Sequence, residues 1–179
     1  MKTLTQHEYS AWCEQRGLRI ESDGILSQDS KSVVLGIPKE TRRVLSLVCE
    51  LLPKEPQFMG GLTWVVDTGS WSDDIIVLGD AILTLMRSSY RLNSIQDDSF
   101  CLFTKDERVH AQAFLAQQLL FGWGGYFVPD SAEYLFVINP DGVLEVVTES
   151  ARWLDFFGEF PEKIGTRQHG KWTSRSSNS

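Results

Sequence analysis

Apolar and polar positions follow two different periods along the chain, and the changes of period mark the expected helices and strands. Thr5 and Glu8 form a capping box ahead of apolar positions at helical spacing, which predicts a short helix that ends at Gly17. A second helix is expected between Pro38 and Pro53. Its apolar stripe consists of Val44, Val48, Leu51 and Leu52. Between the two helices, short strands are expected at residues 18–20, 24–26 and 32–35.

The second half of the chain alternates strands and helices more regularly. Strands are expected at residues 62–67, 100–103 and 126–128, and helices at 72–90 and 104–121. The turn residues Asn139-Pro140-Asp141-Gly142 then predict a hairpin with strands at residues 133–138 and 143–147. A last helix is expected over residues 150–157, with Trp153 and Phe156 facing inward.

This order of elements predicts an α/β or α+β fold with a single domain and helices packed on its sheet. The central β-α-β-α-β segment favours parallel pairing, whereas the C-terminal β-hairpin adds antiparallel strands, so we expect a mixed β-sheet. The domain should span residues 1–164, with an N-terminal part at 1–53 and a main part at 62–157. Residues 165–179 contain mainly Gly, Ser and basic residues, which predicts a flexible tail.

The charge of the chain limits the classes of partner. The net charge is −7, and without the three basic residues of the tail 14 basic residues face 24 acidic ones, so the folded part carries −10. Such a surface repels nucleic acid and attracts a basic protein partner, although solubility alone also explains it. There is no apolar run of membrane-spanning length and no apolar secretion signal in the first twenty residues, which predicts a cytoplasmic protein without a membrane partner.

The inventory of reactive side chains is small. Cys13, Cys49 and Cys101 are far apart and odd in number, which predicts buried free thiols rather than a disulfide framework or a zinc site. His110 could pair with Cys101, but a single histidine on a largely apolar helix is usually structural. No cofactor-binding motif is present, so we expect no cofactor. These features favour a protein without catalytic activity.

Asp67-Thr68-Gly69-Ser70 has the sequence of an aspartic-protease active site, in which two such loops share one proton between their carboxylates. A homodimer could supply the second loop. However, the hydrophobic-hydrophobic-Gly element at residues 75–79 follows too closely to leave room for a flap, and residues 72–90 have helical periodicity. The pattern therefore favours a turn from a strand into a helix, with Gly69 permitting the tight reversal.

The same turn is nevertheless the leading candidate for a binding site. Ligands of open α/β sheets bind beyond the carboxyl ends of parallel strands, where Asp67, Gly69 and Trp71 would lie. Asp73 and Asp74 follow and would oppose a phosphate. They could ligate a divalent cation, but loose acidic clusters are usually solvated helix caps, so no metal site is expected. A small molecule near Gly69 remains an alternative.

A glycine-rich segment at residues 121–126 is the second unusual feature. Its glycines allow the chain to turn from a helix into a strand. Trp123 and Tyr126 then either pack in the core or stand exposed as anchors for a partner. We include both as candidate binding residues.

Several of these segments together resemble a group of small uncharacterised bacterial proteins without an established activity. The resemblance covers about residues 62–148 and rests on residues 64–71, 85–90 and 119–129. It implies a bacterial cytosolic protein and carries over no catalytic residue. The group tends to have Trp-Pro-Ser-Ser-Glu where this chain has Trp71-Ser72-Asp73-Asp74, and it lacks Asp-Thr-Gly, which weakens the protease interpretation.

The functional hypothesis from sequence is therefore a non-enzymatic protein-interaction module. It would be an immunity-like or inhibitor-like acidic protein that binds a basic partner. The alternative is a hydrolase that uses Asp67, either as a dimeric aspartic protease or with a metal shared by Asp73 and Asp74.

Overall fold

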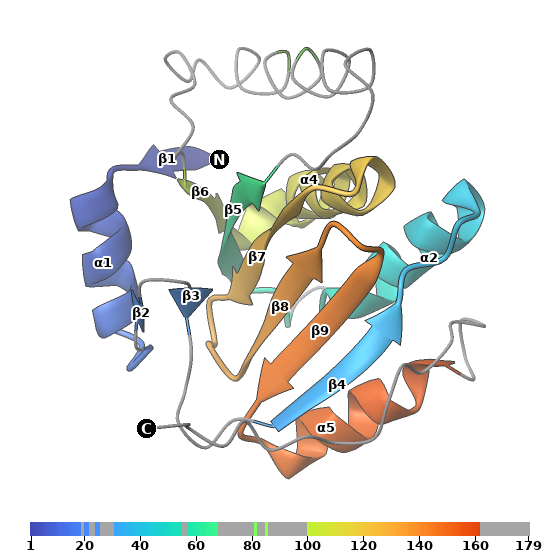
Figure 1. Cartoon of the computed structure of the whole chain (residues 1–179). Coiled ribbons are helices and arrows are strands. Elements are labelled where there is room, and N and C mark those ends of the chain that lie inside the picture. Colours follow the sequence, from blue (N-terminus) through green and yellow to red (C-terminus); the bar gives the residue numbers. More distant parts are fainter. Residues whose placement is uncertain are drawn as a thin grey trace.

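The computed structural model describes residues 1–18, 20–21, 24–25, 31–54, 57–67, 81, 85 and 100–161. Its centre is a seven-stranded sheet with the order β1-β6-β5-β7-β8-β9-β4 (Figure 1). In chain order these strands are β1 (Lys2–Leu4), β4 (Lys31–Gly36), β5 (Gly60–Asp67), β6 (Phe100–Thr104), β7 (Gly124–Pro129), β8 (Tyr134–Asn139) and β9 (Val143–Thr148). A separate pair consists of β2 (Ile20–Glu21) and β3 (Gly24–Ile25). The helices within these ranges are α1 (Gln6–Glu14), α2 (Thr41–Leu51), α4 (Arg108–Phe121) and α5 (Ala151–Gly158).

The fold is a single α+β domain with helices packed on a sheet, as the order of elements predicted. The expectation of a mixed sheet is wrong for the described strands, because every pair in the large sheet is antiparallel. The helix α4 does connect two strands of the same direction, β6 and β7, but β5 lies between them and pairs with both. The strand-helix-strand connection predicts that β6 and β7 run in the same direction. It does not predict that β5 lies between them.

Three helices, α2, α4 and α5, cover one face of this sheet, which we call the first face (Figure 1). Phe127 and Phe136 of the sheet join the same buried cluster as Leu47 of α2, Phe114 of α4 and Phe157 of α5. Burial of a side chain such as Leu47 contributes about 2 kcal/mol. The first face is therefore the main core of the domain.

The opposite, second face packs against α1, which lies apart from the other helices in Figure 1. Tyr9 of α1 stacks on Phe100 at a ring-centroid distance of 3.9 Å and meets the edge of Trp64 at 5.2 Å. At the end of α1, the guanidinium of Arg16 lies 4.0 Å from the ring centroid of Trp12 and pairs with Asp130. These contacts hold the helix on the sheet.

Several local signals at element ends are confirmed, although α1 already ends at Glu14 and α2 begins only at Thr41, three residues after Pro38. The capping box of Thr5 and Glu8 begins α1. A second capping box, Thr104 with Glu107, begins the 3₁₀ turn that leads into α4. Gly122 ends α4 with φ of +62°, and Gly142 has φ of +80° in the hairpin turn. Such positive φ angles favour glycine because an L side chain is strained there.

The buried sides of two helices differ from the expected ones. In α4, helical spacing aligns Val109 and Leu120 with Ala113 and Ala116 as an apolar side, yet Val109 and Leu120 are exposed. In α5, Leu154 is buried and Phe156 is 38% exposed, although Phe156 was expected to face inward. Both helices have large apolar residues on more than one side, so spacing alone does not select the side that meets the sheet.

Other differences concern the ends of the chain and the thiols. The strand β1, which pairs with β6, was not expected. Cys13 and Cys101 are buried as predicted, whereas Cys49 of α2 is exposed. The expected helix at 72–90 and the tail at 165–179 lie outside the described residues, apart from two single positions in the former. None of the helices described is long and apolar enough to cross a membrane.

Candidate functional site

The predicted binding turn begins at Asp67, the last residue of β5. Asp67 lies opposite Gly124 of β7, and the pairing register shifts between Val65 and Asp67, as in a β-bulge. The other four residues predicted for this turn lie outside the described part of the chain; they are Gly69, Trp71, Asp73 and Asp74. A ligand site beyond the end of β5 was expected because parallel strands were expected, but both neighbours of β5 are antiparallel to it.

The two aromatic candidates, Trp123 and Tyr126, point to opposite sides of the sheet. Trp123 is 2% exposed and belongs to the core of the first face, where it stacks on Phe121 at 5.3 Å. Tyr126 is half-buried on the second face and stacks on Trp64 at 4.7 Å. Because Asp67 pairs with Gly124, it lies near Trp123 and Tyr126 in the neighbouring segment. Trp123, however, is too deeply buried to contact a partner.

A buried polar network lies beneath this end of β5. The Nε2 of Gln118 donates a hydrogen bond to the carbonyl oxygen of Trp64 at 3.3 Å. The Thr63 hydroxyl lies 2.7 Å from the carbonyl oxygen of Tyr126 and 3.3 Å from the Oε1 of Gln118. Because Gln118 and Thr63 are fully buried, these bonds satisfy polar groups that water cannot reach. The network explains how α4 holds β5 and β7, and it offers no reactive group.

Two of the three thiols, those of Cys13 and Cys101, likewise pack in the described core. Burial raises the pKa of Cys13 to about 11, so this thiol remains protonated at neutral pH. Within the described ranges, no three side chains of His, Cys, Asp or Glu gather closely enough to hold a metal ion. Asp73 and Asp74, the metal ligands in the alternative hydrolase hypothesis, are outside those ranges.

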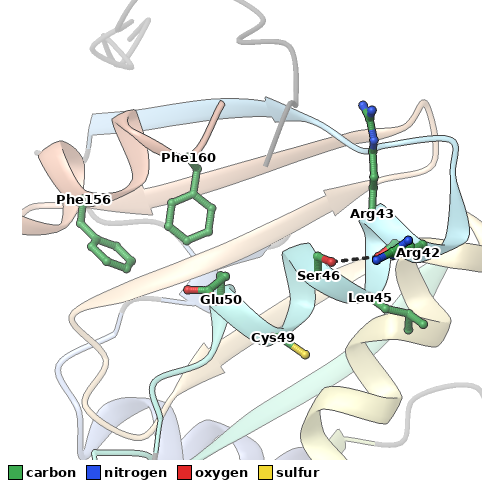
Figure 2. A pocket seen from close by; sticks show the side chains of 8 residues that line it. All are labelled: Arg42, Arg43, Leu45, Ser46, Cys49, Glu50, Phe156 and Phe160. Atoms are coloured by element: carbon green, nitrogen blue, oxygen red, sulfur yellow. Dashed lines mark hydrogen bonds between the residues drawn. The ribbon is translucent and has the colours of Figure 1, made fainter. Parts of the chain in front are cut away.

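The structure instead points to a groove between α2 and α5, which we call the α2–α5 groove (Figure 2). Its volume is about 730 Å³, within the range that proteins use to bind small molecules or side chains of a partner. The residues that line it are Arg42, Arg43, Leu45, Ser46, Cys49, Glu50, Phe156 and Phe160. None of these residues was predicted from the sequence to belong to a site.

The apolar part of the groove combines a buried and two exposed side chains. Phe160 is 2% exposed and forms the inner part, while Phe156 and Leu45 are 38% and 46% exposed. Phe156 is held in place by ring contacts with Phe157 at 5.1 Å and with Phe160 at 5.2 Å. A fixed aromatic ring that remains half in water is a good docking surface, because little side-chain entropy is lost when a partner covers it.

The charged part of the groove is divided between its two ends. Arg42 and Arg43 stand in the first turn of α2, and Glu50 stands in its last turn beside the two phenylalanines (Figure 2). The Nε of Arg43 lies 3.2 Å from a carboxylate oxygen of Glu40. Both of these side chains are largely exposed, so the pair contributes little stability.

Arg108 of α4 holds the carboxyl end of α2, which forms one side of the groove. Its guanidinium donates hydrogen bonds to three carbonyl oxygens at the end of α2, those of Cys49 at 3.3 Å, Leu52 at 3.0 Å and Pro53 at 2.5 Å. The last carbonyls of a helix have no partner within the helix and carry partial negative charge, which a cation satisfies. The groove therefore lies between two elements that are anchored to the core.

The groove could be recognised in the sequence only in part. Leu45 and Cys49 occupy adjacent turns of α2 on the side away from its apolar stripe, and this is a visible signal. Phe156 gave no such signal, because its neighbour Phe157 is equally apolar and only packing shows which of them is buried. The approach of two helices that are a hundred residues apart in the chain is likewise a tertiary property.

A groove of this kind can bury apolar side chains and pair with charged ones. Its polar side chains are those of arginine, serine, cysteine and glutamate, and the Ser46 hydroxyl donates to the carbonyl oxygen of Arg42 at 3.0 Å. This arrangement is suited to binding. Comparisons with protein-family models, with curated proteins and with solved structures found no match to this chain.

Proposed function

We propose that the chain is a non-enzymatic protein-interaction module that binds an apolar segment of a partner protein in the α2–α5 groove. One observation carries the proposal: Phe156, a large aromatic residue held by its neighbours, stays 38% exposed at the wall of the groove. Leu45 of α2 lines the same groove and is 46% exposed. Each such side chain gains about 1 kcal/mol when a partner removes it from water.

The charge of the chain supports a protein as the partner. A net charge of −7 repels phosphate backbones and attracts a basic protein, which speeds their encounter. The proposal therefore keeps the immunity-like or inhibitor-like role, in a bacterial cytoplasm, that the resemblance and the acidic composition favour. In this role the long-range field brings the partner near, and the groove provides the short-range contact.

The proposal is tested by photo-crosslinking in the native host. A benzophenone amino acid at position 45 should give one dominant crosslinked protein, because Leu45 lines the groove. The same amino acid at position 66 is the control, because Val66 of β5 is also an exposed apolar residue but lies outside the groove. The captured protein must then bind the purified wild-type chain, and bind more weakly when Leu45→Gln is introduced. Equal crosslinking at both positions would contradict the proposal.

A further inference from the structure

The charges of α2 oppose the dipole of their own helix. Its first turn contains Arg42 and Arg43 and no acidic residue, and its last turn contains Glu50 and no basic residue. The amino end of a helix carries partial positive charge and its carboxyl end partial negative charge, so both ends place like charges together. The residue at the N-cap, Glu40, makes no capping hydrogen bond and pairs with Arg43 instead. A sequence selected for stability alone would have the reverse order.

Two of these charges are without an ion-pair partner in the part of the chain that the structure describes. Neither Arg42 nor Glu50 takes part in the ion pairs found there. Both are exposed and both line the α2–α5 groove. They are eight positions apart in the helix, which corresponds to about 12 Å along the axis. The groove thus has a cationic end at Arg42 and an anionic end at Glu50, and its two phenylalanines lie beside Glu50 (Figure 2).

Departures from local rules that no folding requirement explains are typical of functional sites. We infer that the α2–α5 groove is a bipolar receptor for an amphipathic helix, which places an acidic side chain against Arg42, apolar side chains against Phe156 and Leu45, and a basic side chain against Glu50. This inference rests on the proposed function and names the chemistry of the segment that is bound. A helix presents side chains about 12 Å apart on one face at positions i and i+8, which matches the separation of the two charges.

The charge at the Arg42 end of the groove is positive, whereas the net charge of the protein is negative. Peptides of different charge can therefore distinguish binding to the groove from attraction by the overall charge. The net charge of −7 alone favours any basic peptide and disfavours any acidic one. The bipolar groove instead accepts either kind of charge at the matching end. Three synthetic helical peptides with the same Leu and Phe face distinguish these cases, one ending in two Glu, one in two Gln and one in two Lys.

Affinities are measured by fluorescence anisotropy at low ionic strength. The Glu-ended and the Lys-ended peptide should both bind about threefold more tightly than the Gln-ended peptide, because an exposed ion pair contributes on the order of 0.2–1 kcal/mol. Arg42→Gln should cancel the gain for the Glu-ended peptide alone, and Glu50→Gln that for the Lys-ended peptide alone. Lys105→Gln and Asp141→Asn are the matched controls, because they change the same charges at exposed positions outside the groove.

The outcomes separate the inference from the function on which it rests. Equal binding of the three peptides, with a loss on Leu45→Gln, would overturn the bipolar groove and leave the docking surface intact. An affinity order of Lys above Gln above Glu, with Lys105→Gln acting like Arg42→Gln, would show that the overall field decides and would also overturn the inference. Failure of all three peptides to bind at millimolar concentration would overturn the docking function itself.

Discussion

Arg108, the first residue of α4, donates a hydrogen bond from its Nε to the carbonyl oxygen of Pro53, just beyond the end of α2. The same guanidinium reaches the carbonyl oxygens of Leu52 and Cys49. This side chain therefore caps the carboxyl end of α2, which has neither a glycine cap nor a basic residue in its last turn. The position of α2, and with it one wall of the α2–α5 groove, depends on a residue more than fifty positions away in the chain.

Replacement of Arg108 by methionine should lower the free energy of unfolding by about 1.5–3 kcal/mol, because three carbonyls lose a charged donor. Urea denaturation followed by circular dichroism measures this loss. Arg42→Met is the matched control, since Arg42 is exposed and forms no ion pair with a described residue. A similar loss in both variants would contradict the role assigned to Arg108.

Gly125 should not tolerate alanine. A Cβ atom there would lie 2.3 Å from the carbonyl oxygen of Trp64 and 2.9 Å from the Nε2 of Gln118, so β5, β7 and α4 would have to move apart. We expect Gly125→Ala to destabilise the fold by about 1–3 kcal/mol. Gly158→Ala is the control, because nothing lies within 4 Å of the added atom and the residue is helical. Equal melting temperatures of the two variants would show that the network is looser than the structure indicates.

The hydroxyl of Tyr134 is buried without a hydrogen-bond partner among the described residues. The ring itself packs against Trp153 at 4.7 Å and Phe157 at 5.2 Å. Removal of an unsatisfied buried hydroxyl costs no hydrogen bond, so Tyr134→Phe should leave stability unchanged or raise it by up to about 1 kcal/mol. Calorimetry checks this. A clear fall in melting temperature would mean that the hydroxyl is satisfied.

Acid stability should depend on the cap of α1. Hydrogen bonds from Lys2 and from the backbone of Thr5 lower the pKa of Glu8 from its ordinary 4.5 to about 2. The ionised carboxylate is thus favoured in the folded state, so its contribution is complete above pH 4.5 and disappears as the pH falls toward 2. Glu8→Gln should reduce the dependence of unfolding on pH within this interval. Parallel curves for both proteins would exclude a role of Glu8.

The ends of elements and the hairpin were predictable from sequence because they depend on a few adjacent residues. The capping box at Thr5 and the glycine at position 142 each act through their own backbone. The choice of buried side was not predictable for α5, where Phe156 and Phe157 compete and only the position of the sheet decides. The pairing of β5 between β6 and β7 likewise needed the tertiary structure.

The candidate site divides in the same way. Aromatic residues near a glycine-rich turn were a reasonable prediction, yet Trp123 was needed for the core of the first face. The residues of the α2–α5 groove could not be predicted as a site, because arginine, leucine and serine are common on the outer side of a helix. Their charge order against the helix dipole was visible in the sequence, but it acquires meaning only once α5 is found beside α2.

The central claim is that the α2–α5 groove is a docking surface for an apolar segment. The most direct measurement is the dissociation constant of the Gln-ended helical peptide for three proteins: the wild type, Leu45→Gln and Val66→Thr. Leu45→Gln should weaken binding about fivefold at an unchanged melting temperature, because a half-exposed leucine loses its contact with the peptide. Val66→Thr should leave binding unchanged. Equal affinities of Leu45→Gln and the wild type, or an equal loss in both variants, would contradict the account.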